Sequence, residues 1–336
     1  EERDRLQQIG PLLLACVWLL AYARRFRRPA PSQPGAPLRR TEPPSPAPPA
    51  FAAKLMGSGN PALATLFDLA QRGALRIDEQ ASRWGRSFTL HREPNPGVLR
   101  PHEHGLLDAL FQSKHGLEDE LSLSKVGTRL GSHQKLFNKP LDEEMALAGL
   151  LDTERQAQRG RLVAAGVLAM LLGGVGFGAG MVWGAVSSDN AQWSVLPFAA
   201  ALAGGGAGLF IAGLLALIVS ATLSTWTEPG EREAADWKSF AAYLKDVTKG
   251  KDDLLDATRF ERYLPYAAGF NLGEAWVKRY EKQSGFAAPP WFQALHADDS
   301  SAAFVAVMVA SHSSFSSSAG AAGGGGASGG GASGAG

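Results

Sequence analysis

The sequence predicts a mainly α membrane protein with three transmembrane helices, a small α+β cytoplasmic module and a helical C-terminal segment. Three observations support this fold class. Residues 162–188 and 190–227 contain no charged side chain, and each run exceeds the ~20 apolar residues that span a bilayer. A third apolar run opens the chain and ends in a cluster of arginines. Between and after these runs lie the periodicities of helices and of a β-hairpin.

The composition excludes several classes of protein. The 336 residues include 33 Lys and Arg against 32 Asp and Glu, so the formal net charge is only +1. A chain this close to neutrality is neither a generally basic nucleic-acid binder nor an acidic tail protein. Cys16 is the one cysteine, which excludes an internal disulfide framework and a cysteine-based zinc site.

The first predicted membrane helix is an anchor within residues 1–23. Four of the five residues at 24–28 are arginine, which is typical of a stop-transfer flank rather than of a signal-peptide cleavage site. The chain does not begin with Met, and an anchor that exits into arginines should follow something on the opposite side of the membrane. We therefore expect an extracytoplasmic region upstream.

Two further predicted membrane helices, 162–186 and 195–221, form a hairpin around the polar turn 187–190. The cytoplasmic flanks of membrane helices carry an excess of lysine and arginine. Basic residues follow the anchor, precede the hairpin and follow the hairpin, whereas the turn has none. This bias predicts that the N-terminus lies outside and that residues 24–161 and the C-terminus are cytoplasmic.

Glycines recur at helical spacing in the hairpin, and we interpret them as a helix-packing face. Small residues on one face let membrane helices approach closely, either within the hairpin or between copies of the chain. The alternative is that membrane helices simply tolerate glycine. The candidate packing residues are Gly174, Gly176, Gly178, Gly180, Gly184, Gly204 and Gly208. Neither helix contains an ionisable side chain, which disfavours a pump or transporter.

A proline-rich linker, 24–50, connects the anchor to a cytoplasmic module, 51–155. The helix, hairpin, helix, helix order of its patterns resembles a winged-helix module. The predicted elements are a helix that begins at Asn60-Pro61 and ends at Gly73, strands over 74–77 and 87–90, and helices over 102–111 and 132–151.

Winged helices often bind DNA, so a membrane-tethered transcription regulator is an alternative function. Residues 51–160 contain fourteen basic and fourteen acidic side chains. Affinity for nucleic acid comes mostly from neutralising phosphates, which a neutral module does poorly. We therefore favour a protein partner over nucleic acid.

A metal site would have to use His102 and His104 with Glu103 or Asp108. A His-x-His pair at a helix start does not place both rings on one helix face. We favour solvated loop histidines, and we expect no metal, no cofactor and no catalytic residue.

After the hairpin, residues 228–300 form a helical cytoplasmic segment. Its first apolar face includes Trp237 and Phe240, and a second helix over 254–281 is expected to break at Pro265. Residues 311–336 form a tail rich in Ser, Gly and Ala, which should be disordered because it has little apolar surface to bury.

Several motifs resemble those of a bacterial family of predicted membrane proteins, domain of unknown function 2207 (YciQ-like). The resemblance covers nearly the whole chain from the first helix onward. It implies an extracytoplasmic β-rich domain upstream and a plasma-membrane location, and it carries over no activity and no catalytic residue. The motif residues are Tyr263, Leu264, Pro265, Tyr266, Trp276 and Trp291, together with the strings Asp68–Gly73 and Thr227–Gly230.

The sequence as a whole predicts a scaffold or signalling-type protein of a bacterial plasma (inner) membrane, without an enzymatic site. It would link an outer domain to a cytoplasmic interaction module. Its expected partners are the lipid bilayer and either a second copy of the chain or another membrane protein. A third alternative is a subunit of a transport or envelope assembly.

Overall fold

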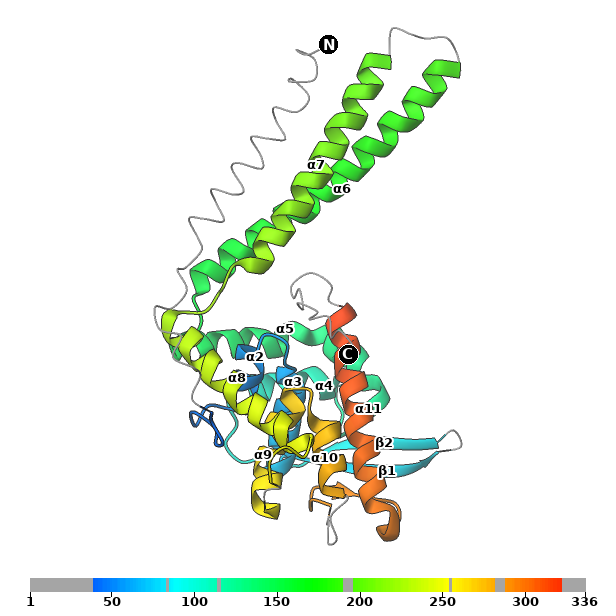
Figure 1. Ribbon diagram of the computed structural model, residues 1–336. Coiled ribbons are helices and arrows are strands. Elements are labelled where there is room, and N and C mark those ends of the chain that lie inside the picture. The colour runs from blue at the N-terminus through cyan, green and yellow to red at the C-terminus, as the bar shows by residue number, and fades with distance from the viewer. Residues whose placement is uncertain are drawn as a thin grey trace. The chain divides into compact units, whose positions relative to one another are not determined.

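The computed structural model describes residues 39–82, 85–113, 116–189, 196–253, 256–281 and 288–321. These residues are mostly helical and divide into two units (Figure 1). We call Asp152–Thr225 the hairpin and the other described residues the module. The predicted anchor, the linker up to residue 38 and the tail from residue 322 lie outside the described residues.

The hairpin consists of two long helices, α6 (Thr153–Asp189) and α7 (Leu196–Thr222). Within them, Thr153–Val186 and Phe198–Ala221 are long and apolar enough to cross a membrane. Only 17% of the most apolar window of each helix is buried, whereas the core helix of a water-soluble protein is mostly buried. The structure thus confirms two of the three predicted membrane helices as candidate spans.

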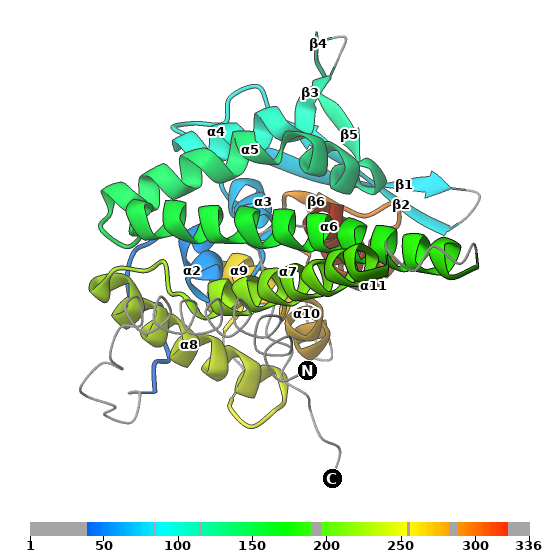
Figure 2. The ribbon, with the colours of Figure 1, turned by 90° about the horizontal axis from the view of Figure 1, so that it is seen from above.

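The module contains a four-stranded sheet, a separate two-stranded β3–β4 sheet and eight helices among its described residues (Figure 2). Its helices are α2 (Pro49–Leu55), α3 (Pro61–Gln71), α4 (Pro101–Phe111), α5 (Leu123–Leu147), α8 (Glu228–Thr248), α9 (Ala257–Gly269), α10 (Gly273–Glu281) and α11 (Ser300–Ala321), with a 3-10 turn η1 (Ala297–Asp299). Its strands are β1 (Leu75–Ser82), β2 (Gly85–Arg92), β3 (Gln112–Ser113), β4 (Gly116–Leu117), β5 (Glu120–Ser122) and β6 (Phe292–Gln293).

The four-stranded sheet has the order β5-β2-β1-β6. Strands β1 and β2 pair antiparallel, with Ile77 opposite Leu90. This pairing confirms the two connected strands that the alternating pattern predicts. Strand β6 joins β1 in parallel from more than 200 residues later in the chain. The segments 51–155 and 228–300, which the sequence treats separately, therefore share one sheet and one apolar core.

The first helices of the module follow their local signals. The Asn60 side chain accepts a hydrogen bond from the Leu63 N–H (3.1 Å), and Pro61 occupies the first turn of α3. Gly73, with φ of 75°, ends the helix as predicted. Helix α4 also matches its prediction, whereas α5 begins nine residues earlier than the predicted 132 and is kinked at His133.

The predicted break at Pro265 is wrong. Pro265 lies inside α9, and the chain turns six residues later at Asn271, whose φ is 62°. A proline in a helix leaves the carbonyl four residues before it without its usual N–H donor. Here the side chain of Gln71 donates a hydrogen bond to that carbonyl, on Glu261, so the helix continues.

The predicted start of the disordered tail at residue 311 is also wrong, because residues 311–321 are the last turns of α11. Ser311 and Phe315 are fully buried in the module. The apolar face of α11 consists of Ala303, Phe304, Val307, Met308 and Phe315. Four of these five residues precede the serine-rich stretch. The composition of residues 311–321 therefore does not indicate that the helix continues through them.

Candidate functional site

Small residues at seven-residue spacing line the interface between α6 and α7. A Cβ on Gly173 would lie 2.4 Å from the Phe210 backbone nitrogen, and one on Gly206 would lie 2.3 Å from the Phe177 nitrogen. The two backbones are therefore in direct contact. We call this interface the seam; its buried small residues are Gly166, Gly173 and Gly180 on α6 and Ala199, Gly206 and Gly213 on α7.

The candidate packing glycines divide between the seam and the outer surface. Gly180 lies in the seam, and Gly176 and Gly184 lie beside it, where added Cβ atoms would meet ordinary contacts at 3.5 and 3.7 Å. Gly208 is half-buried. Gly174, Gly178 and Gly204 have no atom within 4 Å of an added Cβ, so they do not pack within the hairpin. Contact of these three with another copy stays a prediction.

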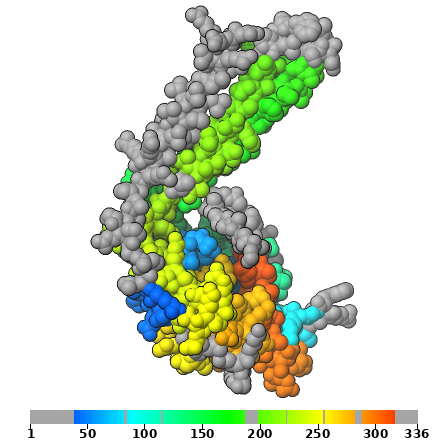
Figure 3. All heavy atoms as spheres, in the orientation of Figure 1, coloured from blue at the N-terminus to red at the C-terminus, as the bar shows by residue number. Residues whose placement is uncertain are grey.

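Large apolar side chains cover the outside of the hairpin. Examples are Leu171 at 64%, Val175 at 72% and Phe198 at 77% exposure. Small residues inside and large apolar residues outside are the opposite of what a helix pair in water needs. The closely packed α6 and α7, green to yellow-green in Figure 3, thus present an apolar surface suited to lipid.

The chain leaves the module for the hairpin and returns to it at two paired module residues, and we call this region of the module the junction. Leu151 and Trp226, the module residues on either side of the hairpin, pair as an antiparallel bridge. Thr227 caps α8: its hydroxyl accepts from the Gly230 N–H at 3.1 Å and donates to the Gly149 carbonyl. A Cβ on Gly230 would lie 2.2 Å from the Leu150 carbonyl oxygen. The Thr227–Gly230 motif therefore fits this close approach.

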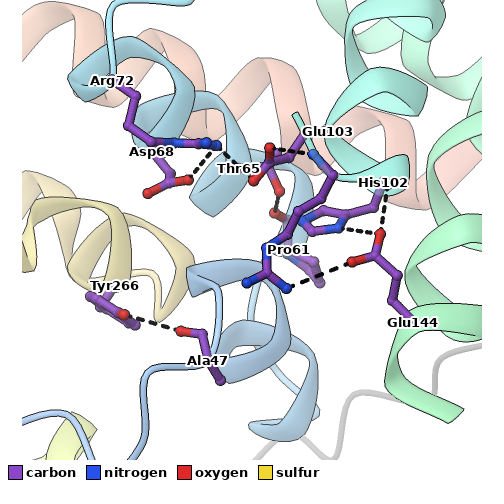
Figure 4. Close-up of polar contacts among 10 residues, drawn as sticks. Ala47, Pro61, Thr65, Asp68, Arg72, His102, Glu103, Glu144 and Tyr266 are labelled. Carbon is purple, nitrogen blue, oxygen red and sulfur yellow. Dashed lines mark hydrogen bonds and ion pairs between the residues drawn. The ribbon is translucent and has the colours of Figure 1, made fainter. Parts of the chain in front are cut away.

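A partly buried cluster of charged residues joins α3, α4 and α5 (Figure 4). The Arg72 guanidinium contacts the Asp68 carboxylate at 2.9 Å and the Glu103 carboxylate at 2.6 Å. The Glu103 side chain is only 3% exposed, and its other oxygen accepts from the Arg100 N–H at 2.9 Å. Burial raises the pKa of the Asp68 carboxyl above its ordinary value, and the Arg72 charge opposes that rise.

His102 extends the cluster to α5. One Glu144 carboxylate oxygen accepts from both the His102 backbone N–H and the ring Nδ1, each at 2.8 Å. The imidazole is 1% exposed and lies against the rings of Phe51 and Phe137. Because each carboxylate has a partner, the cluster fixes how the three helices meet. The sequence reasoning missed it, although Asp68 and Arg72 lie in a motif that the resemblance singled out.

The candidate metal ligands do not converge. His102 and Glu103 are buried, whereas His104 and Asp108 are exposed on the other side of α4. Across the described residues, no group of three or more His, Cys, Asp or Glu side chains is arranged to hold a metal ion.

The motif residues of α9 and α10 lie in the aromatic core of the module. Tyr263 and Leu264 are buried, Tyr266 stacks on Trp237 with ring centroids 5.3 Å apart, and its hydroxyl donates to the Ala47 carbonyl at 3.2 Å. Burial raises the pKa of Tyr266 to about 12. The Trp276 indole N–H donates to the Phe260 carbonyl at 3.2 Å. These residues hold helices together rather than line an open site.

Trp291 connects this core to the sheet. Its carbonyl accepts from the Ile77 N–H at 2.9 Å, next to the pairing of β1 with β6. Its indole packs on Phe67 and Phe304, with centroids 5.7 and 5.6 Å away. The six motif residues of 263–291 therefore position α9, α10 and β6 around α3 and β1.

A cavity of about 350 Å³ opens between α3, α5 and α11. Its polar side chains are uncharged amides and hydroxyls together with one histidine, His312. Asn271, at the turn after α9, donates to the Ser58 carbonyl at 2.7 Å and so fixes one wall. The lining favours small neutral molecules or water over charged ligands.

A family model described as "Predicted membrane protein (DUF2207) C-terminal domain" matches residues 12–280. The match includes both hairpin helices, the junction, the charged cluster and the α9 motif, and it ends before β6 and α11. No curated protein and no solved structure matches the chain.

Proposed function

Because the chain belongs to the DUF2207 family of predicted membrane proteins, we propose that it is a membrane scaffold or signalling-type protein without a catalytic site. It crosses the plasma membrane through α6, α7 and the predicted anchor, with the N-terminus outside and the module in the cytoplasm. The module binds a protein partner and so links that partner to the outer side of the membrane.

The attachment of the hairpin is the observation that carries this proposal. The chain enters and leaves the hairpin next to the paired residues Leu151 and Trp226. The apolar hairpin therefore begins and ends at one point of the folded module. The charged cluster supports a structural role for its ionisable residues, since Asp68, Arg72 and Glu103 pair with one another. A module without net charge that binds a protein is consistent with the attachment of the hairpin and with the paired charges of the cluster.

Site-specific photo-cross-linking tests the scaffold proposal in intact cells. A photoreactive residue at Val98 or Leu147, exposed at 95% and 89% in the module, should capture one protein in stoichiometric amount. The same residue at the exposed hairpin position Val175 is the control and should not capture it. Turnover by the purified chain that a single polar substitution abolishes would overturn the proposal. A partner from a transport or envelope complex would favour the subunit alternative.

Cysteine labelling tests the proposed orientation. In a chain with Cys16→Ser, a new cysteine at Ser188, in the last turn of α6, should react with a membrane-impermeant maleimide in intact cells. A new cysteine at Ser124, at the start of α5, should react only after the cells are opened. The reverse pattern would invert the topology.

A second candidate function is a membrane-tethered winged-helix regulator. The favouring observation is that the β1–β2 pair extends beyond its neighbours, since β6 pairs only with Ile77 and Asp78. A protruding pair of strands of this kind resembles the wing of a winged-helix domain. Fluorescence anisotropy with duplex DNA tests this alternative. We expect no binding at physiological salt, and tight binding that falls steeply with added salt would favour the regulator.

A further inference from the structure

Two arginines stand where the apolar run of α6 begins. Arg159 and Arg161 directly precede Leu162, the first residue of the charge-free stretch. Arg159 is half-buried and Arg161 is exposed. Neither side chain makes an ion pair or hydrogen bond within the ranges that the structure describes. The described residues therefore provide neither guanidinium with a counter-ion.

A third arginine on the same helix provides the contrast. Arg155 lies one turn before Arg159, and its Nε is 3.2 Å from the Asp152 carboxylate. The charge of Arg155 is thus neutralised within the chain. Since the three arginines share one helix but differ in pairing, α6 contains its own matched control.

We propose that Arg159 and Arg161 bind the phosphates of anionic phospholipid headgroups. In a bilayer-spanning α6, a residue just before the apolar run lies at headgroup depth. A guanidinium is weakly hydrated and forms two parallel hydrogen bonds to a phosphate, which suits it to this interface. The inference rests on the hairpin spanning a membrane, as in the proposed function.

The two arginines bind separate lipid headgroups. Residues two apart on a helix point to nearly opposite sides. Arg159 continues the seven-residue series of Gly166 and Gly173 and so lies on the side of the seam, whereas Arg161 lies on the outer side. Their contributions to lipid binding should therefore add.

Native mass spectrometry of the complete chain in gentle detergent measures this preference. The protein is titrated with equal concentrations of phosphatidylglycerol and phosphatidylcholine that have the same acyl chains. We expect phosphatidylglycerol adducts to be favoured by about fivefold for each arginine. The Arg159→Gln, Arg161→Gln double variant should lose about 25-fold of this preference relative to the original chain, and the Arg155→Gln variant should keep it.

Equal binding of the two lipids by the original chain would overturn the proposal, as would an equal loss of preference in Arg155→Gln. Displacement of the lipid by soluble glycerol 3-phosphate at matched concentration would indicate a free-phosphate site and overturn the lipid assignment. Alkaline carbonate extraction separates this failure from that of the proposed function. Release of the chain from membranes overturns both, whereas retention without a lipid preference overturns this inference alone.

Discussion

Pro265 lies within a helix because a distant residue supplies what proline lacks. The Glu261 carbonyl has no N–H from residue 265, and the Gln71 side chain on α3 takes its place. Gln71 belongs to the Asp68–Gly73 motif and Pro265 to the α9 motif. This hydrogen bond joins helices α3 and α9 across 190 positions of the sequence. The contact gives a physical reason for finding the two motifs in the same chain.

A double-mutant cycle tests this pairing. Gln71→Leu should destabilise the module by about 1–2 kcal/mol, because the Glu261 carbonyl loses its donor. Pro265→Ala restores a backbone donor, so Gln71→Leu should cost much less in that background. Thermal unfolding of all four chains in one detergent measures the coupling. Equal costs of Gln71→Leu in both backgrounds would contradict the assignment.

Tyr266 predicts a loss of stability at high pH. Its pKa is about 12 in the folded chain, whereas an unfolded tyrosine ionises near ~10. Between these values the unfolded chain releases a proton that the folded chain retains, so stability falls as pH rises from about 10 to 12, by up to ~2–3 kcal/mol. Tyr266→Phe keeps the stack on Trp237 and should flatten this dependence. Denaturant unfolding at pH 9 and 11 compares the two chains, and identical slopes would contradict the prediction.

Local signals at single residues could be predicted from the sequence, and distant partners could not. The Asn60 cap and the Gly73 stop depend on neighbours within a few positions, and both are confirmed. The Pro265 break fails because its outcome depends on Gln71, which only the fold brings near. For the same reason the contact between His102 and Glu144, 42 positions apart, has no sequence signature.

At the scale of elements, spacing rather than glycine content decides which residues pack. The candidate packing glycines of the sequence analysis are four residues apart, as at Gly180 and Gly184. The contacts of α6 and α7 instead recur every seven residues, as at Gly166 and Gly173. Helices that cross at a small angle meet once in every two turns, which is about seven residues. The existence of both helices follows from composition, but the contacting face depends on this crossing geometry.

Two glycines of α7 form a matched pair for testing the seam. Gly206→Ala would place a Cβ 2.3 Å from the Phe177 nitrogen, and neither backbone can move without separating the helices. We expect a cost of about 1–3 kcal/mol. Gly204→Ala meets no atom within 4 Å and should be neutral or slightly stabilising. Unfolding of the hairpin in mixed micelles by added dodecyl sulfate, followed by circular dichroism, measures both. Equal effects would show that the seam is misplaced.

Helix α11 gives a prediction that composition alone would not. Phe315 lies in a stretch of serines but is 1% exposed. Phe315→Ala should therefore destabilise the module by about 3–5 kcal/mol. His312→Ala, at an exposed position of the same helix, is the control and should have little effect. Thermal melts followed by circular dichroism compare the variants, and an unchanged melt for Phe315→Ala would place residues 311–321 in the tail after all.

The whole molecule combines a module built from distant segments with a hairpin inserted into it. The core includes residues from both sides of the hairpin, and β6 completes the sheet that β1 begins. Sequence order alone separates these segments, because the hairpin stands between them. The Leu151–Trp226 bridge explains how the two segments can still share one core, since it brings the module residues before and after the hairpin together.

If the hairpin is an insertion, the module should fold without it. We consider a chain of residues 39–151 joined to 226–321 by Asn-Gly, which closes a tight turn between antiparallel partners such as Leu151 and Trp226. It should unfold cooperatively, because the core cluster of the module contains no hairpin residue. Thr227→Val in the same chain removes the cap of α8 and should lower stability by about 1 kcal/mol. Calorimetry measures both chains. A broad, non-cooperative transition in the parent chain would mean that the module depends on the hairpin for its fold.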